Sequence, residues 1–329
     1  MSNKYQWLWK SNANPWETNE EEEEWTTYSD IKMTIIEEAF QANLPIVDID
    51  EYIIDLKRLL QIHKIDTTKQ RPIKRISDRN LQCLREERFS LPSHDCVNAT
   101  KSFKNEGQYM TPKFIEEWCE KSFDLTLTER AERAADGIRY EAHLLGQDCE
   151  GEWLAKQILD VKNQSWEEIS LRCLYLYTRE CFLYKLLNQI LREEDLSKVD
   201  TLGPFCDFLW NSFSSDELKK QYSYKGIVYR GATLEMEQIE DYKRSLHKFP
   251  KEWLGFSSTS KNRQLAELYG NTLIIINIPS QSQHLDISTV SNFPEEQEVL
   301  LGASSCFQTE KVLFDEQTNK YHIHLRIVW

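Results

Sequence analysis

Residues 293–301 read FPEEQEVLL and place Glu295, Glu296 and Glu298 directly before an apolar run. Carboxylates this close repel one another, a cost that a solvated turn avoids. The residues alone allow two interpretations. The stretch is either a charged surface turn or the edge of a catalytic site, where one or two carboxylates point at a substrate. Two stretches further upstream bear on this choice.

The first stretch is GIVYRGATL, residues 226–234, which predicts a strand that carries Arg230 and Gly231. The guanidinium group of an arginine binds phosphate oxygens through two parallel hydrogen bonds. We expect the glycine to let a ligand approach the backbone closely. The second stretch is FSSTS, in which Ser258, Thr259 and Ser260 end a predicted strand; Ser260 as the cap of a following helix explains this run equally well.

Composition limits the function classes. The chain has 329 residues, which suggests two or three domains, and its net charge of −14 argues against general binding of duplex nucleic acid. The N-terminus has no apolar signal segment, the C-terminus no lipidation motif, and the longest apolar run, at 273–278, is far too short for a bilayer. We therefore expect a cytoplasmic or nuclear protein that is not secreted and has no membrane partner.

The eight cysteines are scattered and form no C-x-x-C pair, so we expect no metal site. Reduced, buried thiols are the simplest interpretation in a reducing compartment. The sequence leaves a pairing of Cys206 with Cys306 open.

Three regions separate by pattern. Residues 1–77 are rich in Trp and Tyr and predict a small antiparallel sheet with a helix near 34–43, whereas residues 78–110 are typical of a linker. Residues from 111 to about 200 predict helices, and short strands follow, so the fold class is α+β. The expected helix start is Thr111 with Pro112 at its first position. One buried helix face is expected at Leu174, Tyr177, Cys181, Tyr184, Leu187 and Leu191; the strands are expected at 226–234, 253–260, 272–278, 298–314 and 321–329.

The ordered set YRG, GFSSTS and FPEEQEVLL resembles the arginine-specific mono-ADP-ribosyltransferase family, which is known by an R-S-E signature. The resemblance covers about residues 111–329. It implies a helical segment followed by a split β-sandwich core, NAD as substrate, proteins with arginine as acceptors, and no metal. One departure is that Gly302 and Ala303 stand where prolines are frequent in the family.

The resemblance also implies roles for single residues. Glu298 is the catalytic carboxylate, Glu296 is the position linked to arginine as acceptor, and Glu295 has no family role. Arg230 clamps the pyrophosphate, and Ser258 positions the ribose next to the nicotinamide. The NAD-binding residues are thus expected to be Arg230, Gly231, Ser258, Thr259 and Ser260.

Residues 1–77 resemble the WWE domain, through Trp7 or Trp9, Trp25 and Glu37. The tryptophans and the glutamate are expected to be structural, because a small domain needs large apolar side chains in its core. The resemblance implies binding of poly(ADP-ribose) or ADP-ribosylated proteins. The residues expected to bind that ligand are Tyr52, Gln61 and Arg71.

Two alternatives remain open from the sequence. An NAD glycohydrolase would use the same site with water as acceptor. A non-catalytic ADP-ribose reader would use only the first domain, but the intact Arg, Ser and Glu set argues against it. WWE domains more often accompany the polymerase type of catalytic domain, whose first signature residue is a histidine; here that position is Arg230.

Overall fold

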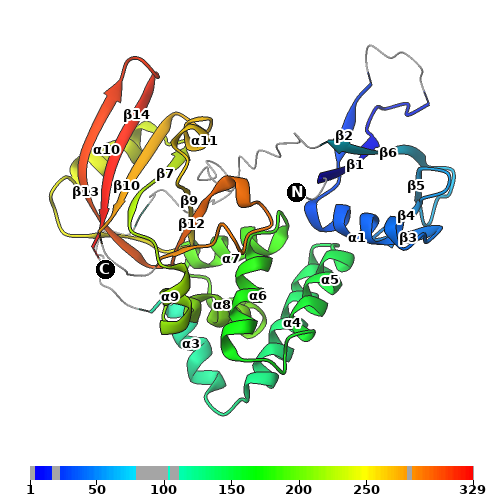
Figure 1. Ribbon diagram of the computed structural model, residues 1–329, viewed down its shortest axis with the longest axis horizontal. Coiled ribbons are helices and arrows are strands. Elements are labelled where there is room, and N and C mark those ends of the chain that lie inside the picture. The colour runs from blue at the N-terminus through cyan, green and yellow to red at the C-terminus, as the bar shows by residue number, and fades with distance from the viewer. Residues whose placement is uncertain (1–3, 17–22, 79–102, 104–110, 280–283, 329) are drawn as a thin grey trace. The chain divides into compact units, whose positions relative to one another are not determined.

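The computed structural model describes residues 4–16, 23–78, 103, 111–279 and 284–328. A β-rich segment, a run of helices and a second β-rich segment follow one another, which confirms the predicted α+β order (Figure 1). The run EEEEE at 20–24, which the sequence predicts as a solvated hairpin loop, lies mostly outside the described residues. The first segment contains β1 (Lys4–Lys10), β2 (Trp25–Thr27), α1 (Asp30–Gln41), β3 (Ile46–Ile49), β4 (Tyr52–Asp55), β5 (Leu60–His63) and β6 (Gln70–Asp78).

These six strands form one antiparallel sheet in the order β2-β1-β6-β5-β4-β3. Helix α1 begins at Asp30, earlier than the predicted residue 34, because the side chain of Ser29 caps it by accepting a hydrogen bond from the backbone N–H of Lys32. The helix packs on the sheet over a core centred on Trp7, Ile36 and Ile54.

Trp7 and Glu37 are structural, as predicted. The indole Nε1 of Trp7 donates to Glu37 Oε2 over 2.9 Å, and the guanidinium of Arg75 donates to both oxygens of the same carboxylate at 2.9 and 2.8 Å. Trp7 is fully buried, whereas Trp9 is half-buried with Arg71 over its ring. The carboxylate of Glu37 therefore joins α1 to β1 and β6.

The chain forms two compact units: residues 1–84, 138–156 and 179–182 make up the first, and residues 85–137, 157–178 and 183–329 make up the second. Within the first unit, the buried guanidinium of Arg179 pairs with Asp30 at 2.7 Å and lies over the ring of Trp153. It also donates to the hydroxyl of Thr34. The first unit is therefore held together by polar contacts between segments that are far apart in the sequence.

The helical segment differs from the prediction at two points. Its first helix begins at Lys113 with Pro112 as the cap, and Thr111 lies outside it. The six predicted face residues are all buried, but they do not form one helix: α6 ends at Tyr177, α7 begins at Phe182, and Cys181 lies in the connection between them. The helices are α3 (Lys113–Ser122), α4 (Leu127–Leu144), α5 (Asp148–Leu159), α6 (Trp166–Tyr177), α7 (Phe182–Glu193), the 3₁₀ turn η2 (Leu196–Lys198), α8 (Val199–Ser212) and α9 (Asp216–Tyr222).

In the second β-rich segment, β10 has the predicted bounds. The predicted strands at 253–260 and 298–314 are each divided in two by a short connection. The elements are β7 (Gly226–Ala232), α10 (Met236–Arg244), β8 (Lys251–Trp253), β9 (Ser257–Ser260), α11 (Arg263–Glu267), β10 (Thr272–Ile278), β11 (His284–Asp286), the 3₁₀ turn η3 (Pro294–Glu296), β12 (Glu298–Leu301), β13 (Ser305–Asp315) and β14 (Lys320–Ile327).

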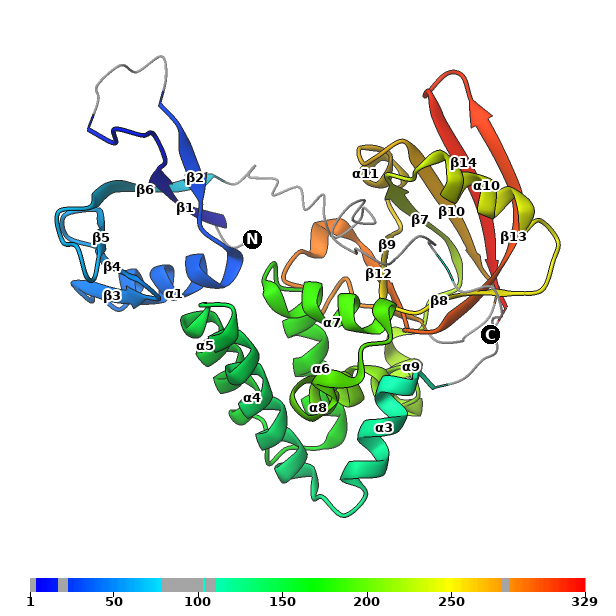
Figure 2. The ribbon, with the colours of Figure 1, turned by 180° about the vertical axis from the view of Figure 1, so that it is seen from behind.

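These strands pair in the order β11-β12-β9-β7-β10-β14-β13-β8, with β10 and β14 parallel. Strands β7 and β9 share a single residue pair, Tyr229 with Ser260. The sheet therefore divides at this point into two parts, as expected for a split β core. Helix α10 lies beside β13 and α11 beside β7 (Figure 2).

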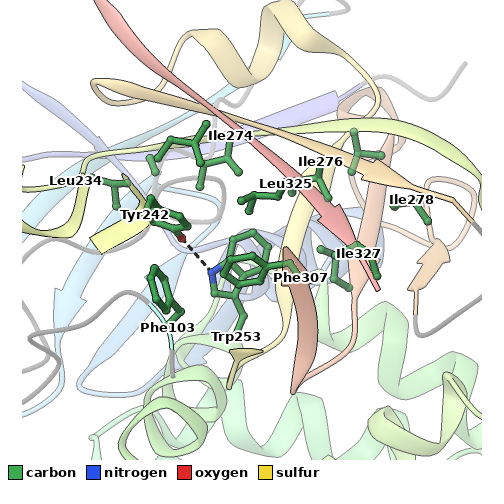
Figure 3. Close-up of a cluster of buried hydrophobic side chains, with 14 of the residues drawn as sticks. Phe103, Leu234, Tyr242, Trp253, Ile274, Ile276, Ile278, Phe307, Leu325 and Ile327 are labelled. Carbon is green, nitrogen blue, oxygen red and sulfur yellow. Dashed lines mark hydrogen bonds between the residues drawn. The ribbon is translucent and has the colours of Figure 1, made fainter. Parts of the chain in front are cut away.

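One residue of the predicted linker packs into the hydrophobic core of this sheet. Phe103 is 7% exposed and packs edge-on against Tyr242 and Phe307, with ring centroids 4.8 and 5.7 Å apart (Figure 3). The indole of Trp253 donates to the hydroxyl of Tyr242, which satisfies both polar groups inside the apolar cluster. Cys206 and Cys306 are both free thiols.

Candidate functional site

Three strands of the second unit bring the predicted catalytic residues together. Strand β12 pairs with β9 so that Glu298 lies opposite Ser260 and Leu300 opposite Ser258. Strand β7 meets β9 at the pair Tyr229 and Ser260, one residue before Arg230. Arg230, the hydroxyl run and Glu298 therefore lie on three neighbouring strands, although 68 positions separate Arg230 from Glu298 in the sequence.

Arg230 is buried in this arrangement, with 6% of its surface exposed. Its Nη1 donates to the backbone oxygen of Ser258 over 2.5 Å, which links β7 to β9 next to their single residue pair. A guanidinium stays protonated in proteins, so burying it is costly unless acceptors surround it. A buried, fixed cation at the junction of the two parts of the sheet is suited to an anionic ligand.

The three hydroxyls of the predicted run, those of Ser258, Thr259 and Ser260 in β9, have different environments. Thr259 Oγ1 donates to the backbone oxygen of Val299 at 2.6 Å, and Ser260 Oγ donates to that of Glu296 at 2.7 Å. Ser260 Oγ also accepts from the backbone N–H of Asn262, which is the actual cap of α11. Among the described residues, the hydroxyl of Ser258 has no hydrogen-bond partner. Ser258 is therefore the hydroxyl of this run that remains for a ligand.

The glutamates also differ from one another. Glu295 is exposed, whereas Glu296 is 4% exposed and Glu298 is fully buried. Gln297, between them, has the left-handed backbone conformation with φ of 49°, which ends η3 and starts β12. The stretch thus holds one exposed glutamate in the turn and a buried pair of carboxylates on either side of Gln297, so each of the two interpretations of FPEEQEVLL applies to part of it.

Backbone contacts fix the position of this pair. The N–H of Lys261 donates to the oxygen of Gln297 over 3.1 Å, and the N–H of Ile287 donates to that of Glu298 over 3.0 Å. Further upstream, the N–H of Asn292 donates to the hydroxyl of Thr178, the residue that caps α6. The segment that leads to the glutamates is therefore attached to both the sheet and the helices of the second unit.

Gly231 has a packing role that the sequence did not reveal. A Cβ atom at this position would lie 2.4 Å from the backbone oxygen of Ala266 and 2.7 Å from the Cβ of Tyr269. The space beside the glycine, where the sequence predicts the approach of a ligand, is filled by α11 and the residues after it. The missing side chain lets the helix pack on β7.

The predicted WWE residues also come together. Tyr52, Gln61 and Arg71 line one pocket of about 310 Å³ in the first unit, called here the Tyr52 pocket. Gln61 Oε1 accepts from the hydroxyl of Tyr28 at 2.6 Å, and Arg71 Nη1 donates to two backbone oxygens of the 10–12 segment. The other lining residues are Ala13, Pro15, Trp16, His63, Thr68, Lys69 and Gln70.

Sequence reasoning missed Trp16, His63 and Lys69 in this pocket. His63 lies directly opposite Tyr52 in the β4–β5 pair, and Trp16 and Lys69 lie outside the strands in connecting segments. The strand pairing offered a signal for His63, because the turn between the two strands sets the register. No comparable signal marks Trp16 or Lys69.

Over the described ranges, no group of three or more His, Cys, Asp or Glu side chains is arranged to hold a metal ion. None of the helices in those ranges is both long and apolar enough to span a bilayer.

Comparisons with known proteins complete the description of the site. The family model for "ADP-ribosyltransferase exoenzyme" matches residues 150–328, and the WWE domain model matches residues 5–75. No curated protein sequence matches the chain.

Among solved structures, the chain is similar to the type III effector XopAI from Xanthomonas axonopodis pv. citri, with 16% identity over 66% of this chain and 96% of that one (TM-score 0.47). It is similar to the ADP-ribosyltransferase HopU1 of Pseudomonas syringae pv. tomato, with 17% identity over 68% and 100% (TM-score 0.42). A third is Exoenzyme S from Pseudomonas aeruginosa, with 19% identity over 60% and 88% (TM-score 0.42).

Proposed function

Because the chain belongs to the ADP-ribosyltransferase exoenzyme family, its reaction class is ADP-ribosyl transfer, and we propose that it moves ADP-ribose from NAD to arginine side chains of proteins. Nicotinamide is released in the same step. The observation that carries this proposal is the buried pair Glu296 and Glu298, joined by hydrogen bonds to the strand that bears Ser258.

The proposed chemistry suits the three residue types. Loss of nicotinamide leaves an oxocarbenium-like ribose, similar to the transition state of glycoside hydrolysis. The carboxylate of Glu298 stabilises the developing positive charge, and its burial strengthens that interaction. Arg230 binds the pyrophosphate and Ser258 positions the ribose, so that much of the rate comes from orientation.

The proposal gives Glu296 the role of receiving the arginine. A guanidinium is a poor nucleophile because it stays protonated, and a nearby anion can orient it and favour loss of its proton. Glu296 has its carboxylate two positions from Glu298 on a backbone held by Ser260. Thr259, Ser260 and Gly231 support NAD binding in this scheme by fixing β9, β12 and β7.

The test is incubation of the purified full chain with labelled NAD and a mixed protein acceptor. Glu298→Gln is expected to lower both nicotinamide release and protein labelling by about 100-fold or more. Glu296→Gln is expected to keep nicotinamide release but to lose the label on arginine. Glu295→Gln is the matched control, since this carboxylate is exposed, and should behave as the wild type.

The same experiment separates the competing chemistries. Free ADP-ribose without labelled protein would favour an NAD glycohydrolase. Label on residues other than arginine would contradict the proposed acceptor. If the wild type consumes no NAD, the transferase proposal fails.

For the first unit we propose binding of poly(ADP-ribose) or ADP-ribosylated proteins in the Tyr52 pocket. The support is that an aromatic ring, an amide and two cationic side chains, Lys69 and Arg71, line one cavity in a chain of strongly negative net charge. Cationic side chains bind the phosphates of a nucleoside diphosphate, and an aromatic face suits its base.

Calorimetry with ADP-ribose tests this second proposal. Lys69→Gln is expected to weaken binding several-fold, and more so at low salt. Lys57→Gln removes an equal charge from an exposed position outside the pocket and should leave binding unchanged. Equal effects of the two changes would show a non-specific charge effect and contradict a site in the pocket.

A further inference from the structure

His63 is a residue of the Tyr52 pocket to which no role has been given so far. It is the last residue of β5 and is half-buried. Its ring meets the ring of Tyr52 edge-on, with centroids 5.4 Å apart and an interplanar angle of 85°. The imidazole therefore lies beside the aromatic ring that the proposed nucleotide would contact.

Its Nδ1 atom already has partners. The backbone N–H groups of Ile65 and Asp66 both point at this nitrogen, at 3.3 and 3.1 Å. A ring nitrogen accepts a hydrogen bond only when it carries no proton, so these two donors fix the tautomer with the proton on Nε2. The turn after β5 thus holds the ring in one orientation and one tautomer.

The opposite edge of the ring is the part available to the pocket. Among the described residues, Nε2 has no hydrogen-bond partner. The charged residues near His63 in the sequence have other partners. Asp66 accepts hydrogen bonds from the hydroxyl and the backbone N–H of Thr68, and Lys64 forms an ion pair with Asp48. His63 therefore offers the pocket an N–H donor beside the cations of Lys69 and Arg71.

We infer that His63 binds the nucleotide ligand directly, by donating its Nε2–H to an oxygen acceptor of the bound ADP-ribose. This inference rests on the proposed function of the Tyr52 pocket. A preset donor recognises an acceptor without a cost for ordering the side chain, and it discriminates against ligands that lack an oxygen at that place. The acceptor is a phosphate oxygen or a ribose oxygen.

Two substitutions distinguish the roles of the two ring nitrogens of His63. In His63→Asn, the side-chain oxygen can still accept from the backbone near the Nδ1 position, but no donor reaches the place of Nε2. In His63→Gln, the amide N–H reaches toward the place of Nε2, but the acceptor for Ile65 and Asp66 is lost. The first change therefore tests ligand contact and the second tests support of the turn.

Calorimetry of the full chain with ADP-ribose, AMP and adenosine is the measurement. His63→Asn is expected to bind ADP-ribose about tenfold more weakly with an unchanged Tm, whereas His63→Gln should have a lower Tm and retain more of the affinity. If the acceptor is an oxygen of the phosphate next to adenosine, the loss appears with AMP but not with adenosine, and if it is an oxygen of the adenosine ribose, the loss appears with both. A loss with ADP-ribose alone places the acceptor on the second phosphate or the distal ribose.

Nitrogen-15 NMR of the histidine rings supplies the second readout. Nδ1 of His63 should show the chemical shift of an unprotonated nitrogen in the free protein. The inference is overturned if the ring is in the other tautomer, or if His63→Asn binds ADP-ribose as tightly as the wild type. If the wild type binds ADP-ribose but His63→Asn is unaffected, only the role of His63 fails; if the wild type binds none of the three probes, the proposed binding function fails with it.

Discussion

At the scale of single residues, Ser258 and Ser260 have identical side chains on one strand, but their hydroxyls have different roles. Ser260 bonds to the backbone of Glu296, and Ser258 has no partner among the described residues. We expect Ser258→Ala to lower kcat/KM for NAD with little change in Tm. Ser260→Ala should lower the free energy of unfolding by about 1–2 kcal/mol, because a buried backbone oxygen loses its donor.

Thermal unfolding and NAD consumption, measured on both variants, check this prediction. A loss of stability in Ser258→Ala that matches the loss in Ser260→Ala would contradict the division of tasks. Thr259→Ala is a useful companion, since its hydroxyl bonds to Val299 and it should behave like Ser260→Ala.

His284 makes stability depend on pH. It is buried, which lowers its pKa, and its Nε2 is hydrogen-bonded to the backbone oxygen of Tyr224. The unfolded chain binds a proton on this ring near pH 6.5 and the folded chain only at lower pH, so the free energy of unfolding falls as the pH drops through this range. The difference is about 1.4 kcal/mol for each unit by which the folded pKa is lower.

Urea unfolding at several pH values tests this expectation. His284→Gln should lose stability less steeply than the wild type below about pH 6.5. His247→Asn, at an exposed position, is the control and should retain the slope of the wild type. Equal slopes for His284→Gln and the wild type would rule out this role of His284.

At the scale of elements, helix α11 depends on Gly231. An added Cβ would lie 2.4 Å from the backbone oxygen of Ala266, and a backbone atom cannot move aside as a flexible side chain can. We expect Gly231→Ala to lower the free energy of unfolding by about 1–3 kcal/mol. Differential scanning calorimetry measures this directly. An unchanged Tm with lost NAD binding would instead support the original expectation of ligand approach.

Element by element, the sequence predicted periodic segments well and interruptions poorly. The run TLIIINI is apolar and bounded by polar residues, and β10 has those bounds. The spacing of three and four residues continues from Leu174 to Leu191, yet Thr178 ends α6, because this spacing records burial and does not record where backbone hydrogen bonds stop. The strand predicted at 253–260 is interrupted around Gly255 for the same reason.

For the site, the residue types and their order were predictable and their individual tasks were not. The order of Arg230, the hydroxyl run and the glutamates was visible in the sequence. The distinction between Ser258 and Ser260 depends on the register of β9 with β12, a long-range pairing that local sequence does not encode. The left-handed conformation of Gln297 is likewise unusual for a residue other than glycine.

At the scale of the whole molecule, Phe103 comes from the segment predicted as linker but belongs to the core of the second unit. Its ring is almost fully buried against Tyr242 and Phe307. Phe103→Ala is expected to lower the free energy of unfolding by about 3 kcal/mol, because the cavity it leaves lies inside a packed aromatic cluster. Phe103→Leu should recover most of that loss.

Chemical denaturation of the full chain measures both variants. Exposed Phe249 offers the control, since Phe249→Ala removes the same ring from a position that is 86% exposed. A Phe103→Ala variant as stable as Phe249→Ala would show that the ring does not contribute to the core.

The buried ion pair of Arg179 with Asp30 has a consequence for how such a chain can be recombined. Asp30 belongs to the WWE segment and Arg179 to the segment matched by the transferase model, yet both lie in one compact unit. Excising residues 1–78 would remove Asp30 and Thr34 together, so the guanidinium of Arg179 would lose the carboxylate that pairs with it. Genetic exchange of either segment alone would break this ion pair unless the new segment supplies the matching charge, so the two segments are expected to be inherited as a pair.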